Sequence, residues 1–242
     1  MADEQGPLDA ADTLTLADWR RQVAGLYAEV RRLAADDPPA ALAHWRAARE
    51  RLYREHPQSP VPAAERATFR ASHFAHDPGL RFEVAVEPAD ADAGAGAVAD
   101  AGSGSAGLAG LTLHLPTSGG TSMAFRRFGT VTVPLPGGSR RLEVYWMAGY
   151  AGGLFLPFRD ATNGIETYGA GRYLLDGAKS ADLGGDPDRG TLVLDFNFAY
   201  QPSCAFDPRF ACPLAPPANR LDVAIRAGER LDPSDQARPA GQ

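Results

Sequence analysis

The sequence predicts a mainly β protein of the α+β class: an antiparallel β-barrel or sandwich of about eight strands with an N-terminal helical hairpin packed on it. Three observations support this fold class. Apolar residues recur at helical spacing near the amino terminus, and from Leu80 onward they alternate with polar residues, as in half-buried strands. The later strand-like segments follow one another too closely for crossover helices, which excludes a parallel βαβ topology.

The first helix of the hairpin is expected from Thr15, after a polar, Ala-rich stretch at residues 1–12 that we interpret as a flexible tail. Thr15 and Asp18 have the spacing of a capping box, which marks a helix start. Apolar residues then follow at helical spacing: Leu16, Trp19, Val23, Leu26, Tyr27, Val30 and Leu33.

The second helix is expected from about Pro39 to His56, because proline suits the first helical turn and the prolines between residues 57 and 62 end the helix. The hairpin therefore occupies residues 13–62. One stripe of this helix is apolar and is expected to face a larger body: Leu42, Trp45, Leu52 and Tyr53. We interpret its arginines as the solvated face: Arg46, Arg49, Arg51 and Arg54.

The sheet domain is assigned to residues 63–230, followed by a second flexible tail at 231–242. Its first strand begins at Leu80, and a low-complexity Ala, Gly, Asp and Ser stretch at 88–107 is interpreted as a disordered insertion between two strands. The further strands are expected at about 108–116, 128–136, 140–148, 153–159, 165–175, 191–199 and 220–227.

Composition narrows the class of partner. The chain has 242 residues, 44% of them hydrophobic, a formal net charge of −6 and a pI near 5.4. An acidic protein gains no counterion release from phosphates, which argues against nucleic acid as a partner. No apolar run is long enough to span a bilayer, and acidic residues stand where a signal peptide needs a basic and then an apolar stretch. We therefore expect a cytoplasmic protein without membrane contact.

Residues 149–219 place polar and charged side chains inside segments whose neighbours favour strands. A buried polar group without a partner costs about 1–3 kcal/mol, so such a cluster is either a satisfied internal network or a binding site. The candidate ligand-binding residues are Arg159, Asp160, Thr162, Glu166, Tyr168, Arg172, Asp195 and Asn197.

Two interpretations of this cluster remain open. In the first, Arg159 or Arg172 binds an anionic group, and Glu166 or Asp195 acts as an acceptor or a base. In the second, arginine–carboxylate pairs form an internal network that fixes the register of the strands.

The two cysteines, Cys204 and Cys212, lie in one Pro-rich loop. A reducing compartment favours free, packed thiols, whereas the short spacing is compatible with a disulfide, and reactive or metal-bound thiols are a third alternative. Two sulfurs alone do not complete a tetrahedral zinc site. His73 and His76 have an unspecific spacing with no third strong ligand nearby, so we predict no metal site and no cofactor.

Several long segments resemble the DUF1684 family of uncharacterised bacterial and archaeal proteins. The resemblance covers nearly the whole chain except the tails and the low-complexity insertion. It is carried by Leu16–Arg31, Trp45–Val61, Leu154–Asp176, Leu194–Leu221 and Ala227–Arg230. The family has no established activity, so the resemblance implies a signature region rather than a reaction.

Carried over by position, the polar-rich family signature favours a site over a purely structural network. It falls on Phe158, Arg159, Asp160, Thr162, Glu166, Thr167, Tyr168, Gly169, Gly171, Arg172, Asp176, Asp195, Asn197, Pro202, Cys204, Cys212, Pro213 and Asn219. The family usually has an aromatic or aliphatic residue at positions 73 and 76, which argues further against a metal. Some members look exported, which keeps a Cys204–Cys212 disulfide open.

Three functions follow from these observations. The first is the binding of a small polar or anionic metabolite in a barrel pocket lined by the signature between Arg159 and Asn197. The second is an enzyme that uses the same pocket, with Asp195 or Glu166 as general base and Tyr168 as acid or oxyanion donor. The third is an interaction or scaffold role, in which the hairpin presents a groove to a partner. Three aromatic residues of the hairpin argue more for packing onto the barrel than for exposure: Trp19, Tyr27 and Trp45.

Overall fold

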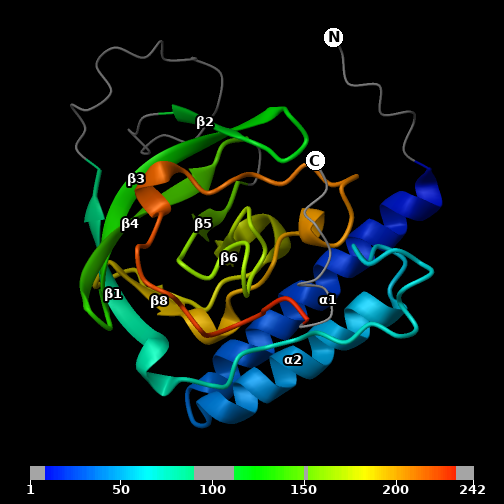
Figure 1. Ribbon diagram of the computed structural model, residues 1–242, viewed down its shortest axis with the longest axis horizontal. Helices are drawn as coiled ribbons and strands as arrows, with labels where there is room; N and C mark the ends of the chain where they lie inside the picture. Colours follow the sequence, from blue (N-terminus) through cyan, green and yellow to red (C-terminus); the bar gives the residue numbers. More distant parts are fainter. Residues whose placement is uncertain (1–8, 90–111, 150–151, 233–242) are drawn as a thin grey trace.

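The structure, a computed structural model, describes residues 9–89, 112–149 and 152–232. Two helices lie side by side against one side of a curled antiparallel sheet (Figure 1). The mainly β, α+β prediction with a packed helical hairpin is therefore confirmed. The insertion expected at 88–107 lies outside the described residues from position 90, and so do 1–8 and 233–242 of the two expected tails.

Helix α1, Ala10–Ala34, begins earlier than the predicted start at Thr15. The Asp9 carboxylate accepts a hydrogen bond from the N–H of Ala11 at 3.3 Å and caps the helix there. Residues 10–12, expected in the tail, are consequently helical. The Thr15 hydroxyl donates to the carbonyl of Asp12 at 2.9 Å, an arrangement inside a helix rather than at its start.

Helix α2, Pro38–Glu55, agrees with the prediction to within about one residue at each end. The Asp37 carboxylate accepts from the N–H of Ala40 at 3.0 Å, and the prolines occupy the first helical positions, where no N–H is needed. The predicted apolar stripe is buried. Trp45 Nε1 donates to the Tyr27 hydroxyl at 3.1 Å, a buried hydrogen bond that joins α2 to α1.

Within the described residues the sheet has eight strands, in the order β6-β5-β4-β3-β1-β8-β7 with β2 paired to β3, and every pairing among them is antiparallel. The exclusion of a parallel sheet is thus confirmed. The strands are β1 Arg81–Pro88, β2 Thr112–Pro116, β3 Ser122–Leu135, β4 Gly138–Met147, β5 Leu154–Phe158, β6 Arg172–Asp176, β7 Gly185–Asp186 and β8 Thr191–Asp195.

Strand β1 gives the sheet its curl because it changes partner along its length. Its first residues pair with β8, in the register of Arg81 with Asp195, and its last pair with β3. The far end of the sheet then returns to β8, since Tyr173 in β6 and Tyr200 beyond β8 exchange backbone hydrogen bonds of 2.9 and 3.1 Å. The result is a half-barrel in which one isolated bridge joins β6 to the segment that follows β8.

Three of the predicted strands are wrong in extent, and a fourth is absent. The strand expected at 128–136 begins six residues earlier, since β3 starts at Ser122. Residues 165–171 form a loop ahead of β6, and β8 ends at Asp195, after which residues Phe196–Phe198 turn as a 3-10 helix. Residues 220–227 alternate in burial as a strand would, yet they form no strand. The two-residue strand β7, which was not predicted, takes its place among the eight strands.

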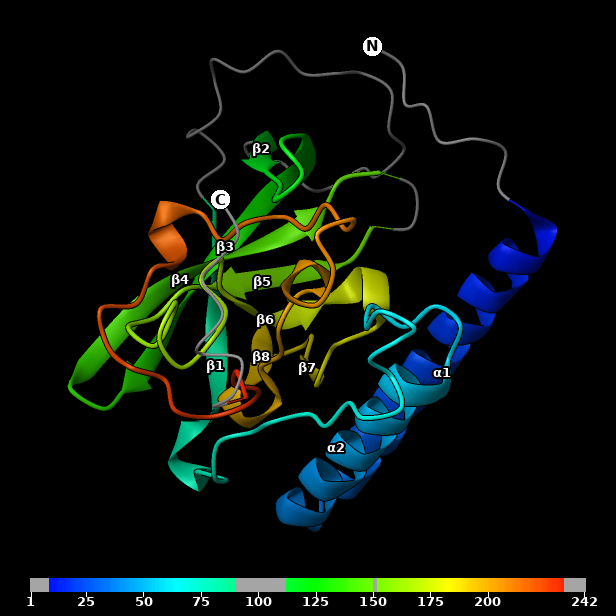
Figure 2. The same cartoon turned by 45° about the vertical axis from the view of Figure 1, so that its right-hand side comes forward.

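Two hydrophobic clusters lie on the two faces of the half-barrel. One fills the space between the helices and the outer face, where Trp45 packs edge-on against Phe198 with ring centroids 5.4 Å apart. The other fills the inside of the curl around Phe158 and Phe196. Figure 2 shows the helices along one side, and the carboxyl-terminal segment, orange to red, runs across the opposite side.

Candidate functional site

Arg172, one of the two predicted anchors, lies at the centre of a buried network inside the half-barrel. Its guanidinium is fully buried and donates to the Asp160 carboxylate at 2.7 Å, with both side chains at 0% exposure. It also donates to three carbonyls of the carboxyl-terminal segment: Ile225 at 2.7 Å, Ala227 at 2.5 Å and Glu229 at 3.1 Å. Arg172 thereby fastens that segment over the half-barrel, although burial lowers the pKa of its guanidinium.

The loop that follows Asp160 is held by its own side chains. Asp160 accepts from the N–H of Thr162 at 2.6 Å and from its hydroxyl. The Thr162 and Thr167 hydroxyls lie 2.8 Å apart, and Asn163 Nδ2 donates to Thr167 and to the Tyr168 carbonyl, each at 2.9 Å. These hydrogen bonds fix the conformation of the loop at residues 160–168.

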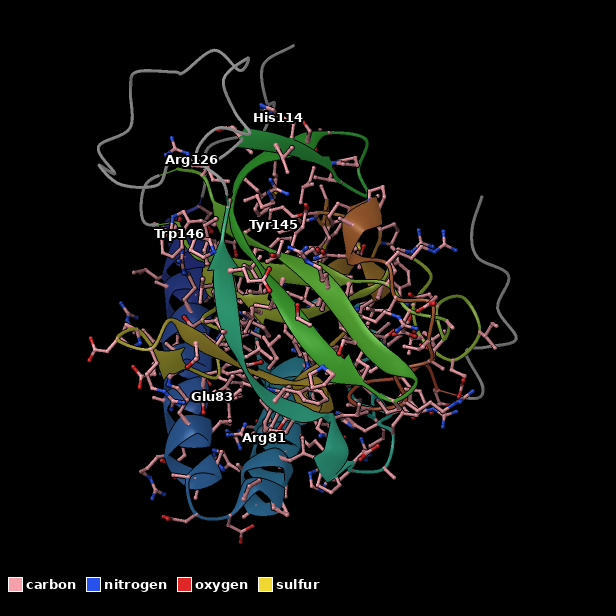
Figure 3. The ribbon with its side chains drawn as sticks, turned by 90° about the vertical axis from the view of Figure 1, so that its left-hand side faces the viewer. Arg81, Glu83, His114, Arg126, Tyr145 and Trp146 are labelled. Carbon is pink, nitrogen blue, oxygen red and sulfur yellow. The ribbon has the colours of Figure 1, made fainter. Side chains whose placement is uncertain are left out.

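Asp195 and Asn197 form a second buried pair, separate from Arg172. Asn197 donates to the Asp195 carboxylate from its backbone at 2.9 Å and its side chain at 2.8 Å, and it exchanges hydrogen bonds with the backbone of Asp77. Arg81 approaches Asp195 at 3.7 Å from the start of β1, at the opposite end of the sheet from Trp146 (Figure 3). Burial raises the pKa of Asp195.

The other predicted residues occupy further surroundings. Glu166 forms an ion pair with the exposed guanidinium of Arg226 at 2.9 Å. Arg159 contributes its backbone, which bonds to Asn219 and Leu221 at 2.9 and 2.7 Å. The structure thus brings Asp160, Thr162 and Arg172 together. Glu166 belongs to the same loop, since its N–H donates to the Thr162 carbonyl at 2.8 Å, although its carboxylate pairs with Arg226. The Asp195–Asn197 pair makes its hydrogen bonds elsewhere.

The two cysteines are free and buried side by side. The N–H of Cys204 points at the sulfur of Cys212 at 3.3 Å, and the Tyr168 hydroxyl contacts the Cys204 thiol. Tyr168, a predicted catalytic residue, is therefore a neighbour of the thiols rather than of Asp195 or Glu166.

A largely apolar hollow, which we call the helix–sheet cavity, lies between α1, α2 and the outer face of the half-barrel. Its volume is about 330 Å³. Aromatic rings from both layers contribute to its wall: Trp19, Tyr27, Tyr53, Phe155, Tyr173 and Tyr200. Leu16 and Met123 are 45% and 39% exposed and also line it, so its mouth is apolar.

One wall of this cavity is polar. The buried Asp176 carboxylate accepts from the Tyr200 hydroxyl at 2.9 Å and lies 3.6 Å from the Lys179 ammonium. Lys179 also donates to the Ser203 hydroxyl at 3.3 Å. Burial beside Asp176 raises the pKa of Tyr200 well above its ordinary value, so this hydroxyl stays a donor. The wall therefore offers a carboxylate, an ammonium group and a phenol within one patch.

Arg49 closes another part of the wall, and here the prediction that it belongs to the solvated face is wrong. Its side chain is only 11% exposed, and its guanidinium lies 4.3 and 4.4 Å from the ring centres of Tyr53 and Tyr200. Two of its nitrogens donate to the carboxylate of Glu229. Burial opposes the charge, but Glu229 outweighs it and raises the pKa of Arg49.

A signal for Arg49 was present in the sequence. Trp45, Arg49 and Tyr53 are each four residues apart, so Arg49 belongs to the apolar stripe of α2 rather than to the opposite face. The cavity itself had no comparable signal, because its lining comes from α1, α2, four strands and the loop after β8.

Two further hollows are more polar. An open groove of about 670 Å³ follows α2 past Arg46, Arg51 and His73. A hollow of about 530 Å³, which we call the loop cavity, lies beside Tyr168 and Gly169. Among the described residues, no group of three or more His, Cys, Asp or Glu could hold a metal ion, and no helix is long and apolar enough to cross a membrane.

Comparisons with known proteins agree with the resemblance seen in the sequence. The family model described as a protein of unknown function, DUF1684, matches residues 70–230. The solution NMR structure of an uncharacterised protein of Haloarcula marismortui is similar, with a TM-score of 0.56 and 33% sequence identity over 83% of this chain and 97% of that chain. No curated protein matches the chain. The match to the family model covers the sheet, the signature loop and the cysteine loop, while both helices precede it.

Proposed function

The chain belongs to the DUF1684 family of proteins of unknown function, and from this premise we propose that it binds a small amphipathic molecule in the helix–sheet cavity. The observation that carries the proposal is an enclosed aromatic hollow with one polar wall. The predicted pocket of Arg159, Asp195 and their neighbours is not where this ligand lies, because those residues engage partners in separate surroundings.

The size and lining of the cavity favour a ligand with an apolar, planar body. Small-molecule sites in proteins are mostly apolar hollows of about 300–1,000 Å³ with a few oriented polar groups, and a volume of about 330 Å³ suits a ligand of one or two fused rings. The apolar mouth at Leu16 and Met123 lets such a body enter without leaving polar groups unsatisfied.

The polar wall favours one hydroxyl or amine on that body rather than a free anion. The charge of Arg49 is balanced by Glu229, and the Asp176 carboxylate is shared between Lys179 and the Tyr200 hydroxyl. A donor group on the ligand adds a hydrogen bond to Asp176, whereas a carboxylate there meets a like charge.

The test uses 2-naphthol as the probe, with titration calorimetry and the fluorescence of Trp19, which lines the cavity. Val23→Phe fills the cavity from α1, and Ala24→Phe is its matched control because Ala24 is exposed on the same helix. We expect 2-naphthol to bind the wild type and Ala24→Phe, and to lose at least about tenfold in affinity in Val23→Phe.

Naphthalene serves as the second probe because it has the same rings without the hydroxyl. We expect it to bind more weakly than 2-naphthol to the wild type, and this preference to shrink in Asp176→Asn. Equal binding of 2-naphthol to Val23→Phe and Ala24→Phe, with both variants folded by circular dichroism, contradicts the proposal.

A further inference from the structure

The segment that follows β8, which we call the cysteine loop, holds the buried thiols of Cys204 and Cys212 side by side. Cys204 and Cys212 are 8% and 6% exposed, and the N–H of Cys204 lies 3.3 Å from the sulfur of Cys212. Ser118 fixes the position of Cys212 from the neighbouring loop: its hydroxyl accepts from the N–H of Cys212 at 3.0 Å, and its own N–H donates to the Cys212 carbonyl at 2.9 Å. The two sulfurs are thus held close while both remain reduced.

The surroundings of the two thiols differ. Cys204 is contacted by the Cys212 thiol and by the Tyr168 hydroxyl, and these hydrogen bonds lower the pKa of Cys204 to about 6. The pKa of Cys212 is raised, first by its contact with Cys204 and then by burial. At neutral pH the pair consequently consists of one thiolate and one thiol, which are the nucleophile and the second thiol that a disulfide-forming reaction requires.

One cavity reaches the pair directly, at Cys212, and a second is separated from Cys204 by Tyr168. Cys212 lines the helix–sheet cavity, and Tyr168 lines the loop cavity. The low exposure of both thiols excludes bulky disulfide substrates from direct attack, whereas a small uncharged molecule fits hollows of this size. Of the common oxidants of thiols, hydroperoxides are small and uncharged.

We propose that Cys204 and Cys212 form a peroxide-reducing dithiol whose substrate is a small hydroperoxide. The Cys204 thiolate attacks the terminal peroxide oxygen, the O–O bond breaks, and the alkoxide leaves as an alcohol after taking a proton from solvent. Cys204 is then a sulfenic acid. The Cys212 sulfur attacks the Cys204 sulfur, the S–O bond breaks, and hydroxide leaves as water with the Cys212 proton.

Atoms and electrons balance over the two reaction steps. Two thiols and one hydroperoxide give one disulfide, one alcohol and one water, so the sulfurs lose two electrons and the O–O bond accepts them. A small external dithiol returns the disulfide to the reduced pair by thiol–disulfide exchange. The reaction does not depend on the ligand proposed for the helix–sheet cavity, and the two proposals are tested separately.

The test treats the reduced full-length chain with tert-butyl hydroperoxide and follows intact mass, peptide mapping and peroxide consumption. In the wild type we expect loss of two hydrogen masses, a Cys204–Cys212 linkage and one peroxide consumed per chain. Cys212→Ser is expected to stop at the sulfenic acid, which dimedone traps, and Cys204→Ser to react at least about tenfold more slowly than Cys212→Ser.

Tyr168→Phe keeps both thiols and removes one hydroxyl from Cys204, so it separates a reactive site from a merely packed one. We expect it to slow the reaction near neutral pH and to approach the wild-type rate at high pH, where Cys204 is ionised in both. Equal rates for Cys204→Ser and Cys212→Ser, or a wild-type chain that keeps both thiols under peroxide while folded, would falsify the proposal.

Discussion

Replacing Arg172 with leucine decides between the two interpretations of the polar signature, an internal network and a ligand-binding site. Arg172 is fully buried, and its guanidinium serves the Asp160 carboxylate and three carbonyls of the carboxyl-terminal segment. Leucine fills part of the space but donates no hydrogen bond. The Asp160 carboxylate then stays inside the half-barrel without its cation.

The expected cost follows from these contacts. Removing one partner of a buried ion pair costs about 3–5 kcal/mol. The carbonyls also lose charged donors, which places Arg172→Leu near the upper end, about 5 kcal/mol. Since domains are stable by about 5–15 kcal/mol, this is a large share of the total. For a domain of this size it corresponds to a fall in Tm of about 10–20 °C.

Urea unfolding monitored by circular dichroism measures this loss. Asp160→Asn in the Arg172→Leu background is expected to recover about 1–2 kcal/mol, because the buried carboxylate no longer lacks a cation. The control is Arg226→Leu, which removes an exposed arginine paired with Glu166 and is expected to leave the unfolding free energy nearly unchanged. A loss below about 1 kcal/mol for Arg172→Leu refutes the network interpretation, since an arginine held in reserve for a ligand weakens the fold instead of supporting it.

Two further predictions concern backbone geometry and pH. Gly171 has a φ of +106°, and a Cβ there would lie 2.5 Å from the Phe158 carbonyl oxygen, so Gly171→Ala is expected to cost at least about 2 kcal/mol in urea unfolding. Gly25→Ala in α1, with nothing within 4 Å, is expected to stabilise by about 0.5–1 kcal/mol, and equal effects of the two would contradict this reasoning. Burial raises the pKa of Asp195 from its ordinary value of 3.8, so its contribution to stability is fully present below that value and is lost as the pH rises through the higher folded-state pKa. The unfolding free energy of the wild type relative to Asp195→Asn should therefore fall as the pH rises across this window; a difference that grows with pH would mean that the fold favours the charged carboxylate.

Local patterns predicted the helical hairpin and most of the sheet because one buried face leaves a period of 3.6 residues in a helix and of two in a strand. The alternation at residues 220–227 was also real, since Leu221, Ile225 and Ala227 are buried. The inference of a strand failed because the carbonyls of Ile225 and Ala227 accept from the Arg172 side chain. The backbone of Leu221 and Val223 bonds to residues just after β5 and not to a neighbouring strand. Side-chain periodicity reports burial, and it does not report what the backbone bonds to.

The candidate site was harder to predict because its parts are distant in the sequence. The polar signature was interpreted as favouring a site, and the structure shows two of its residues, Asp160 and Arg172, in a buried ion pair with each other. The helix–sheet cavity depends on how two helices rest on a curved sheet, which no local pattern encodes. The burial of Arg49 was predictable but was missed. Its four-residue spacing from Trp45 and Tyr53 places it on the apolar stripe of α2.

The pairing of Arg49 with Glu229 bears on where an autonomous folding unit begins. The stretch recognised as common to the family starts at residue 70, downstream of both helices, yet the 3%-exposed Glu229 near its end takes its counter-cation from α2. A shortened chain starting there would leave the Glu229 carboxylate without its cation and would expose the rings of Phe155 and Phe198 to solvent. The segment before residue 70 is thus required for the fold of the rest, and such a truncation should aggregate instead of folding.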